Sequence, residues 1–242
     1  EDFGYYHLPH IINLISEKII FGIANVNDGF VHNSIWLNLM SLFFYEKNYN
    51  LVNLPTFLVY SIFIIFCFKK IIDEKLKGPT RYFLIICLFY LLLKFTRISE
   101  FGTDIPALIF ASLSIFNFLR YEEEVDIKSK EYFFFSHVSF CVFAILIKFS
   151  VMPILVFTIY IFFRDYGKLH KEIFKFNYFF IYIIFIIFFT QQFIYTGCFF
   201  FPSEITCLKV SWFNEYFIQI RDKLELINKS YSEAKDLISK KD

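Results

Sequence analysis

The sequence predicts an all-α, polytopic membrane protein with about six spans and external amphipathic surface helices. Of its 242 residues, 57% are hydrophobic, and the mean hydropathy is +0.53, whereas soluble domains are roughly 45–50% apolar. The apolar residues come in long blocks, and Lys and Arg gather in every second connection between them. These features predict spans that alternate in direction across a bilayer. A net charge of +1 gives no electrostatic support for a nucleic-acid partner.

Residues 1–55 form the first predicted segment, which lies outside the membrane and carries two amphipathic helices on the bilayer surface. In the first helix the apolar side chains recur at helical spacing: Leu8, Ile11, Ile12, Ile15 and Ile19. The polar side chains on its other face are His10, Asn13, Glu17 and Lys18. The second helix, over roughly 30–45, presents Val31, Ile35, Leu39 and Leu42. We expect Trp36 to anchor it at the membrane interface.

Residues 56–196 form the predicted transmembrane bundle. Its apolar blocks run over about 56–68, 82–96, 105–119, 132–147, 151–163 and 176–196. Several are shorter than the roughly 20 residues that cross a bilayer, but flanking aromatic and Lys side chains can extend them. The stretch 132–163 is either one kinked span or a hairpin that turns between Lys148 and Pro153. We favour the hairpin, because both residues mark a turn.

The charges of the connections predict the orientation of the bundle. The connections 69–81, 120–131 and 164–175 carry twelve Lys and Arg residues, whereas the alternate connections carry three: Lys94, Arg97 and Lys148. By the positive-inside rule the basic connections are cytoplasmic. Residues 1–55, the loop 97–104, the turn near Lys148 and everything after about 197 are then external. This assignment places four carboxylates at one membrane surface: Glu1, Asp2, Glu100 and Asp104.

Residues 197–242 form a predicted external loop and helical tail. Cys198 and Cys207 lie nine residues apart in the loop, and in an oxidising compartment they can form a disulfide. The chain begins at Glu1 rather than Met, and its acidic, aromatic start is unlike a signal peptide. We therefore expect at least one further span to precede it.

Five short segments resemble a bacterial family of multi-span membrane proteins. The chain opens with Asp-Phe-Gly-Tyr-Tyr-His-Leu-Pro at residues 2–9, and Phe-Gly-Ile-Ala-Asn at 21–25 and His-Asn-Ser-Ile-Trp at 32–36 follow. Gly-Thr-Asp-Ile-Pro at 102–106 and Thr-Gly-Cys-Phe-Phe-Phe-Pro-Ser at 196–203, with Trp212 downstream, complete the resemblance over about 1–215. That family is itself similar to the GT-C glycosyltransferases, which include the protein mannosyltransferases and the aminoarabinose transferases.

The resemblance implies an activity and a location. A GT-C enzyme of the bacterial inner membrane takes a sugar from a polyprenyl-phosphate donor and transfers it to an acceptor on the outer face. Asp2 matches the first acidic position and is the candidate base, whereas Asp104, with Glu100 as a partner, matches the second. The same two positions, Asp2 and Asp104, would hold a divalent metal such as Mg²⁺ or Mn²⁺ if one is used. His7 matches the opening motif and is a candidate substrate contact.

Three cations lie at the predicted outer boundary, where the phosphate of a lipid donor would need them: Lys94, Arg97 and Lys148. Each candidate also has an ordinary structural interpretation. Asp2 or Asp104 can cap a helix, Glu100 can be a solvated loop residue, and Lys near a span end snorkels to the interface.

Two other functions remain open. A transporter or flippase for lipid-linked solutes would need polar residues deep within several spans, and the span centres are nearly all Ile, Phe and Leu, with Asn117, Gln191 and Gln192 near their ends. A non-catalytic scaffold in envelope polysaccharide assembly would need no converging carboxylates.

Overall fold

The computed structural model describes residues 7–16, 19–26, 28–46, 48–73, 76, 78–96, 102–165, 178–201 and 203–214. These residues are helical, apart from loops and one isolated antiparallel bridge between Cys198 and Cys207, which agrees with the predicted all-α class. The chain divides into two compact units. Unit 1 contains residues 1–18 and 34–188, and unit 2 contains residues 19–33 and 189–242.

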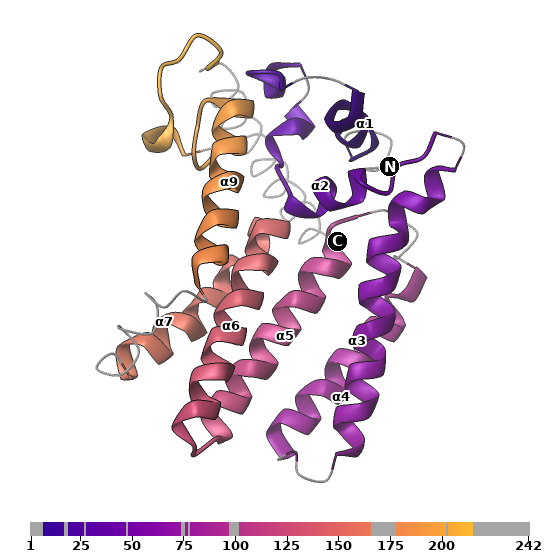
Figure 1. The fold of residues 1–242 in the computed structure, drawn as a ribbon, viewed down its shortest axis with the longest axis vertical. Coiled ribbons are helices and arrows are strands. Elements are labelled where there is room, and N and C mark those ends of the chain that lie inside the picture. The colour runs from indigo at the N-terminus through magenta and orange to yellow at the C-terminus, as the bar shows by residue number, and fades with distance from the viewer. Residues whose placement is uncertain are drawn as a thin grey trace, which may run out of the picture. The chain divides into compact units, whose positions relative to one another are not determined.

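The centre of unit 1 consists of four long helices that run antiparallel in chain order (Figure 1). They are α3 (Leu54–Ile72), α4 (Gly78–Leu93), α5 (Asp104–Glu123) and α6 (Ile127–Ile147). Their ends follow the local sequence. Pro55 occupies the first turn of α3, and Asp126 caps α6 by accepting a hydrogen bond from the backbone N–H of Ser129 at 2.9 Å. Each helix corresponds to one predicted apolar block.

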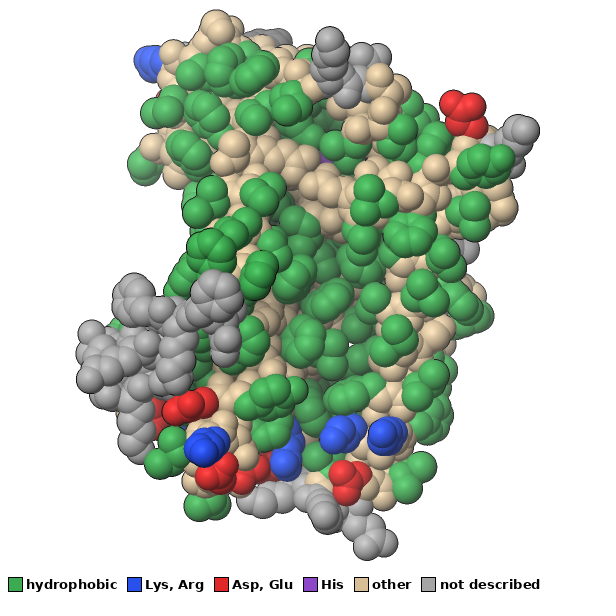
Figure 2. Space-filling model, viewed as in Figure 1, with side chains coloured by type: hydrophobic (Ala, Val, Ile, Leu, Met, Phe, Trp, Pro, Cys, Tyr) green, Lys and Arg blue, Asp and Glu red, His purple; other side chains and the backbone are tan. Residues whose placement is uncertain are grey.

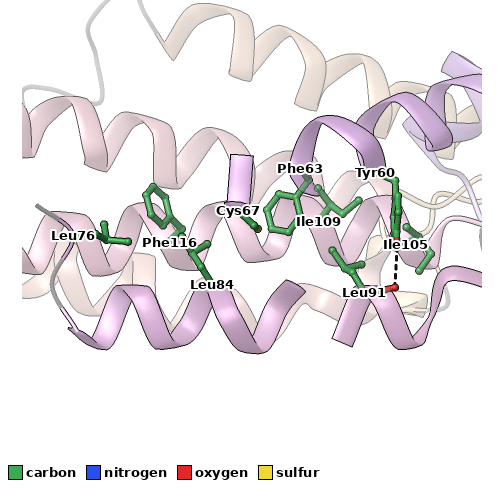
Figure 3. Packing of buried hydrophobic residues seen from close by; sticks show 9 residues of the cluster. All are labelled: Tyr60, Phe63, Cys67, Leu76, Leu84, Leu91, Ile105, Ile109 and Phe116. Carbon is green, nitrogen blue, oxygen red and sulfur yellow. Dashed lines mark hydrogen bonds between the residues drawn. The ribbon is translucent and has the colours of Figure 1, made fainter. Parts of the chain in front are cut away.

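An apolar core joins α3, α4 and α5 (Figure 3). Phe63 and Cys67 of α3 pack with Leu84 of α4 and Ile109 of α5, and all four are buried. Tyr60 lies in the same core, where its hydroxyl donates to the carbonyl of Leu91 at 3.1 Å. The antiparallel order thus brings the start of α3 to the end of α4.

The predicted hairpin after α6 is present. A 3₁₀ segment, Phe149–Ile154, turns the chain into α7 (Leu155–Arg164). Near the end of α7, Arg164 donates to Glu122 of α5 at 2.7 Å, and the next residue, Asp165, accepts a bond from Tyr121 at 2.8 Å. Both partners lie in the last turn of α5, at the end of the bundle where α6 begins. Because α7 ends beside them, it runs back along α6. The kinked-span alternative is wrong.

Charged side chains gather at one end of unit 1, around the α3–α4 and α5–α6 connections and the end of α7 (Figure 2). We call this the charged end. The described charged residues there include Lys69, Lys70, Arg81, Arg120, Glu122, Lys130 and Arg164. The opposite end holds few charges, among them Lys94, Asp104 and Lys148. The structure therefore separates the basic connections from the poorly charged ones, as predicted.

Three segments are long and apolar enough to cross a membrane: Tyr49–Ile72, Ile127–Ile147 and Phe179–Thr196. Gly78–Leu93 and Phe149–Arg164 are shorter apolar helices. The last of the long segments is α9, which begins in unit 1 and ends in unit 2. A membrane protein with several apolar helices is thus supported.

The surface helices of unit 1 are α1 (Leu8–Ser16) and α2 (Ile35–Ser41). Their predicted orientation is wrong in two respects. His10, expected on the polar outer face, is buried in α1 together with Ile11, whereas Ile12 and Ile15 are exposed, as a face toward lipid would be. Trp36 of α2 is buried rather than an interface anchor, because its Nε1–H donates to Thr56 Oγ1 of α3 at 3.0 Å. The exposed apolar face of α1 still suits contact with lipid.

Candidate functional site

An ion pair between Asp104 and Lys148 marks the end of unit 1 opposite the charged end. Asp104 is the first residue of α5, and Lys148 directly follows α6 as its C-cap. Lys148 Nζ donates to Asp104 Oδ1. Each charge lies where its helix dipole favours it, the carboxylate at an N-terminus and the ammonium at a C-terminus. The two side chains keep 59% and 40% of their surface exposed, so a ligand can reach both.

The surface helices pack beside this ion pair. Ser34 caps α2 and donates through its hydroxyl to the carbonyl of Ile147, at 2.8 Å. Ile147 precedes Lys148 and is buried with Ala107, one turn after Asp104. The same cluster contains Ile11, Trp36, Leu37, Met40 and Val52. The surface helices therefore hold in place the start of α5, which carries Asp104, and the end of α6, which carries Lys148.

His7 and His10 lie at the start of α1, within the surface helices. Both are buried, with 4% and 2% of their surface exposed. Burial, followed by the nearby charge of His7, lowers the pKa of His10 to about 4. His10 is consequently neutral at pH 7. Its buried position corrects the prediction that it covers the polar outer face of the helix.

Only some of the predicted site residues lie together in the described part of the structure. Lys94 follows α4, with its Nζ 5.9 Å from the centre of the Tyr90 ring. This ring contact fits a Lys side chain held at a span end. Asp2, Arg97 and Glu100 lie outside the described residues. Of the predicted residues, then, Asp104 and Lys148 are the two that the structure brings into direct contact.

The capping interpretation of Asp104 is not what the structure shows. Thr103 holds the N-cap position of α5 but makes no side-chain capping bond, and the carboxylate of Asp104 pairs with Lys148 instead. Among the described residues, no three His, Cys, Asp or Glu side chains lie close enough to hold a metal ion. A divalent ion at Asp104 would need the predicted second ligand, Asp2, or another residue outside the described ranges.

A second polar cluster, which the sequence analysis missed, lies midway along α6. His137 is fully buried, and its Nδ1 lies 2.9 Å from the carbonyl oxygen and 2.8 Å from the hydroxyl of Ser114 on α5. Its Nε2 lies 2.9 Å from the hydroxyl of Thr158 on α7. The Ser114 hydroxyl also donates to the carbonyl of His137, at 3.0 Å. One imidazole thus joins three helices.

This cluster corrects the premise that the span centres lack polar residues. His137 stands ten residues from either end of α6, about 15 Å at the helical rise. The sequence did contain a signal for this cluster, namely a single His within an apolar run. Ionisable residues in spans are rare and usually have a specific partner. The bonds to Ser114 and Thr158 occupy both ring nitrogens, which favours helix association over solute transport.

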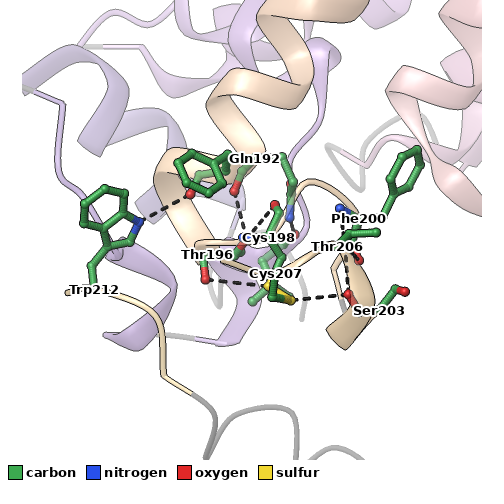
Figure 4. The surroundings of a disulfide bond; sticks show 10 residues. Gln192, Thr196, Cys198, Phe200, Ser203, Thr206, Cys207 and Trp212 are labelled. Carbon is green, nitrogen blue, oxygen red and sulfur yellow. Dashed lines mark hydrogen bonds between the residues drawn. A yellow bond between two sulfur atoms is a disulfide. The ribbon is translucent and has the colours of Figure 1, made fainter. Parts of the chain in front are cut away.

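Unit 2 contains the predicted disulfide, between Cys198 and Cys207 (Figure 4). The bridge closes the loop that follows α9. Inside the loop, the backbone N–H of Phe199 donates to the carbonyl of Thr206 at 3.1 Å, and the Thr196 hydroxyl bonds the carbonyl of Cys198 at 3.1 Å. The segment from Gly197 onward is therefore held by covalent and hydrogen bonds.

The segment 21–25, which carries part of the family resemblance, contacts Trp212 in unit 2. The Phe21 ring contacts the Trp212 ring with centroids 4.8 Å apart, and Asn25 Nδ2 donates to the Trp212 carbonyl at 2.8 Å. Gly22 lies between them with φ 70°, where an added Cβ would come within 2.8 Å of the Trp212 Cβ. The backbone N–H of Gly22 donates to Ile194 of α9 at 2.9 Å. These contacts explain why a glycine and a tryptophan occupy these positions.

The fold defines a helical protein whose described part includes three helices able to cross a membrane. The chain belongs to the family described as domain of unknown function DUF8201, whose model matches residues 1–240. No curated protein and no solved structure matches the chain.

Proposed function

We propose that this chain is part of a polytopic GT-C-type glycosyltransferase of a bacterial inner membrane. It transfers a sugar from a polyprenyl-phosphate donor to an acceptor on the outer face, in envelope glycan or glycolipid assembly. The proposal includes about six spans, formed by α3 to α7 and α9, with the charged end in the cytoplasm. The contact between Asp104 and Lys148 carries the proposal, since it joins a predicted catalytic carboxylate to a predicted phosphate-binding cation.

The proposed reaction is a direct displacement at the anomeric carbon. An acceptor hydroxyl forms the new C–O bond, and the bond from that carbon to the donor phosphate breaks with its electron pair on the departing polyprenyl phosphate. The acceptor proton passes to a carboxylate, for which Asp2 is the candidate. Asp104, with Glu100, orients the acceptor or holds a divalent ion if one is used.

The ion pair suggests how donor binding would prepare the site. Without donor, Lys148 and Asp104 neutralise each other. A donor phosphate offers Lys148 a second anionic acceptor that competes with Asp104, since hydrogen bonds between ionised groups are strong. Lys148 would then leave Asp104 for the phosphate, with Arg97 and Lys94 as further contacts. The released Asp104 carboxylate would face the acceptor. His7 is buried, so a contact with the substrate would require the start of α1 to move.

The test is transfer by the full-length protein in membrane vesicles that carry a panel of labelled polyprenyl-phosphate sugars. We expect Asp104→Asn to lower turnover by about 100-fold, the size of loss that follows when a reactant is misplaced by about 1 Å. Lys148→Gln should raise the donor KM by roughly tenfold, as expected for one lost charged hydrogen bond. The control is Glu46→Gln, an exposed residue outside the pair.

Three results would count against the enzyme. They are the absence of transfer from every donor, normal turnover by Asp104→Asn, or equal losses in Asp104→Asn and Glu46→Gln. A variant of Asp104 that assembles envelope polysaccharide normally would favour the scaffold instead.

A further inference from the structure

An apolar cavity of about 640 Å³ lies within unit 1, between α6, α7 and the first turns of α9. Its walls include Phe134, Val138 and Val142 of α6, Ile159 and Phe162 of α7, and Phe185 of α9. Thr158 also lines it, but its hydroxyl bonds His137. The volume lies within the roughly 300–1,000 Å³ of small-molecule sites. An aliphatic chain suits such a wall, because it needs no hydrogen bonds.

The cavity extends toward the charged end. Phe134 lies one helical turn beyond Lys130 on the same face of α6, about 6 Å along the axis. Phe163, another wall residue, directly precedes Arg164 on α7. A chain in the cavity would therefore end near charged side chains at this end of the bundle.

The two cations beside the cavity, Arg164 and Lys130, differ in their pairing with carboxylates. Arg164 pairs with Glu122 at 2.7 Å and with Asp165 at 2.9 Å. Lys130 Nζ lies 5.3 Å from the centre of the Tyr121 ring and forms no ion pair with any residue in the described ranges. Lys130 also interacts electrostatically with Asp165, but that carboxylate is already bonded by Arg164 and Tyr121. Lys130 is thus the cation best placed to bind an incoming anion.

We infer that this cavity and Lys130 bind one anionic phospholipid from the leaflet at the charged end. One acyl chain occupies the cavity between α6, α7 and α9, and the phosphate lies at Lys130. Basic positions between membrane helices on the cytoplasmic side are typical places for anionic head groups. A free phosphate would leave the apolar wall empty, and a zwitterionic lipid would gain less from Lys130. The inference rests on the proposed orientation, with the charged end in the cytoplasm, but not on the proposed glycosyl transfer.

The test uses the full-length protein in nanodiscs with spin-labelled phosphatidylglycerol or phosphatidylcholine of the same acyl chains. Electron paramagnetic resonance measures the immobilised lipid fraction. We expect about fivefold preference for phosphatidylglycerol, which is the effect of one cation near an anionic surface. Lys130→Gln should abolish the preference. Lys69→Gln, a matched change on α3 at the charged end but away from the cavity wall, should retain it.

Two further variants test the cavity itself. Val138→Phe and Val142→Phe each place a larger side chain in the wall, so both should reduce immobilisation of either lipid without changing the thermal midpoint by more than a few degrees. If one fails to fold, the other supplies the result. Equal binding of the two lipids by the wild type, a preference that survives Lys130→Gln, or unchanged binding by a folded cavity variant would overturn the inference. Stronger binding of polyprenyl phosphate than of phosphatidylglycerol would also overturn it, by assigning the site to the sugar donor.

Discussion

His137 Nε2 lies 2.9 Å from Thr158 Oγ1, deep between α6 and α7. The Ser114 hydroxyl donates to the His137 carbonyl, which leaves the Ser114 carbonyl for a proton on Nδ1. In the neutral tautomer that carries this proton, Nε2 is an acceptor within reach of the Thr158 hydroxyl. One tautomer can thus satisfy the contacts with all three helices.

The first prediction concerns this bond. Thr158→Val keeps the side-chain shape but leaves Nε2 of a buried imidazole without its hydroxyl partner. We expect the free energy of unfolding to fall by about 1 kcal/mol, the usual size for a hydrogen bond between membrane helices. The measurement is unfolding by denaturing detergent in bicelles.

Two variants calibrate this prediction. Thr158→Ser retains the hydroxyl and should retain most of the stability. Ser139→Ala removes a hydroxyl of α6 that bonds the carbonyl of Phe135 in its own helix, at 2.8 Å, and no other helix in the described ranges, so it should cost little. A Thr158→Val protein as stable as Ser139→Ala would contradict the role of the cluster.

The helices of unit 1 were predictable because their signals are local. Each apolar block became one helix, and Lys148 and Pro153 marked the turn between α6 and α7. The separation of charges into two ends followed from the alternation of the basic connections. The disulfide was predictable as a pairing of two external cysteines, although their spacing alone could not fix its geometry.

The orientation of the surface helices depended on tertiary contacts that periodicity does not encode. Trp36 is buried against α3, where the Thr56 hydroxyl accepts a hydrogen bond from the indole N–H. His10 is buried although it is polar, and the spacing of apolar residues gave no sign of this; Ile15 stays exposed on the face that suits lipid. The pair of Asp104 with Lys148 needed the antiparallel contact of α5 with α6, since the two residues lie 44 positions apart.

The second prediction concerns Gly22 in unit 2. Gly22→Ala forces a side chain into a left-handed backbone position and within 2.8 Å of the Trp212 Cβ. We expect unit 2 to lose about 1–3 kcal/mol, the cost of one such strained residue. Near-ultraviolet circular dichroism and the fluorescence of Trp212 should report looser packing. Gly78→Ala is the control, because Gly78 begins α4 with a negative φ and its nearest neighbour is Tyr82 at 3.6 Å. Equal stability of the two variants would contradict the argument.

The third prediction concerns the disulfide of unit 2. The paired change Cys198→Ser and Cys207→Ser removes a link across nine positions. We expect a loss of about 2–3 kcal/mol from the greater entropy of the open chain. Thermal unfolding with and without reductant measures it. Reductant should lower the midpoint of the wild type alone, and an equal effect on the serine variant would contradict the assignment. Cys67→Ser offers a control for the loss of a buried thiol elsewhere.

The fourth prediction is a dependence of stability on pH that comes from His10. The unfolded histidine binds its proton near pH 6.5, whereas the folded one, desolvated in α1 beside His7, binds it near pH 4. Between these values the unfolded state holds more protons, so stability falls as the pH falls. The stability that depends on a neutral His10 is complete above the pKa of the unfolded state, near 6.5, and is lost by about pH 4. Its size is on the order of 3 kcal/mol.

The measurement is the free energy of unfolding at steps from pH 7.5 to pH 4. His10→Gln removes the titrating group from this buried position, so it should make the decline shallower while lowering stability at neutral pH. The control, His32→Gln, replaces an exposed histidine and should retain the decline. If His10→Gln declines as steeply as the wild type, the acid sensitivity belongs to another group. If the wild type is equally stable at pH 7 and pH 4.5, His10 is solvated in the folded protein and α1 does not bury it, which would also remove the firm packing of the surface helices beside Asp104 and Lys148.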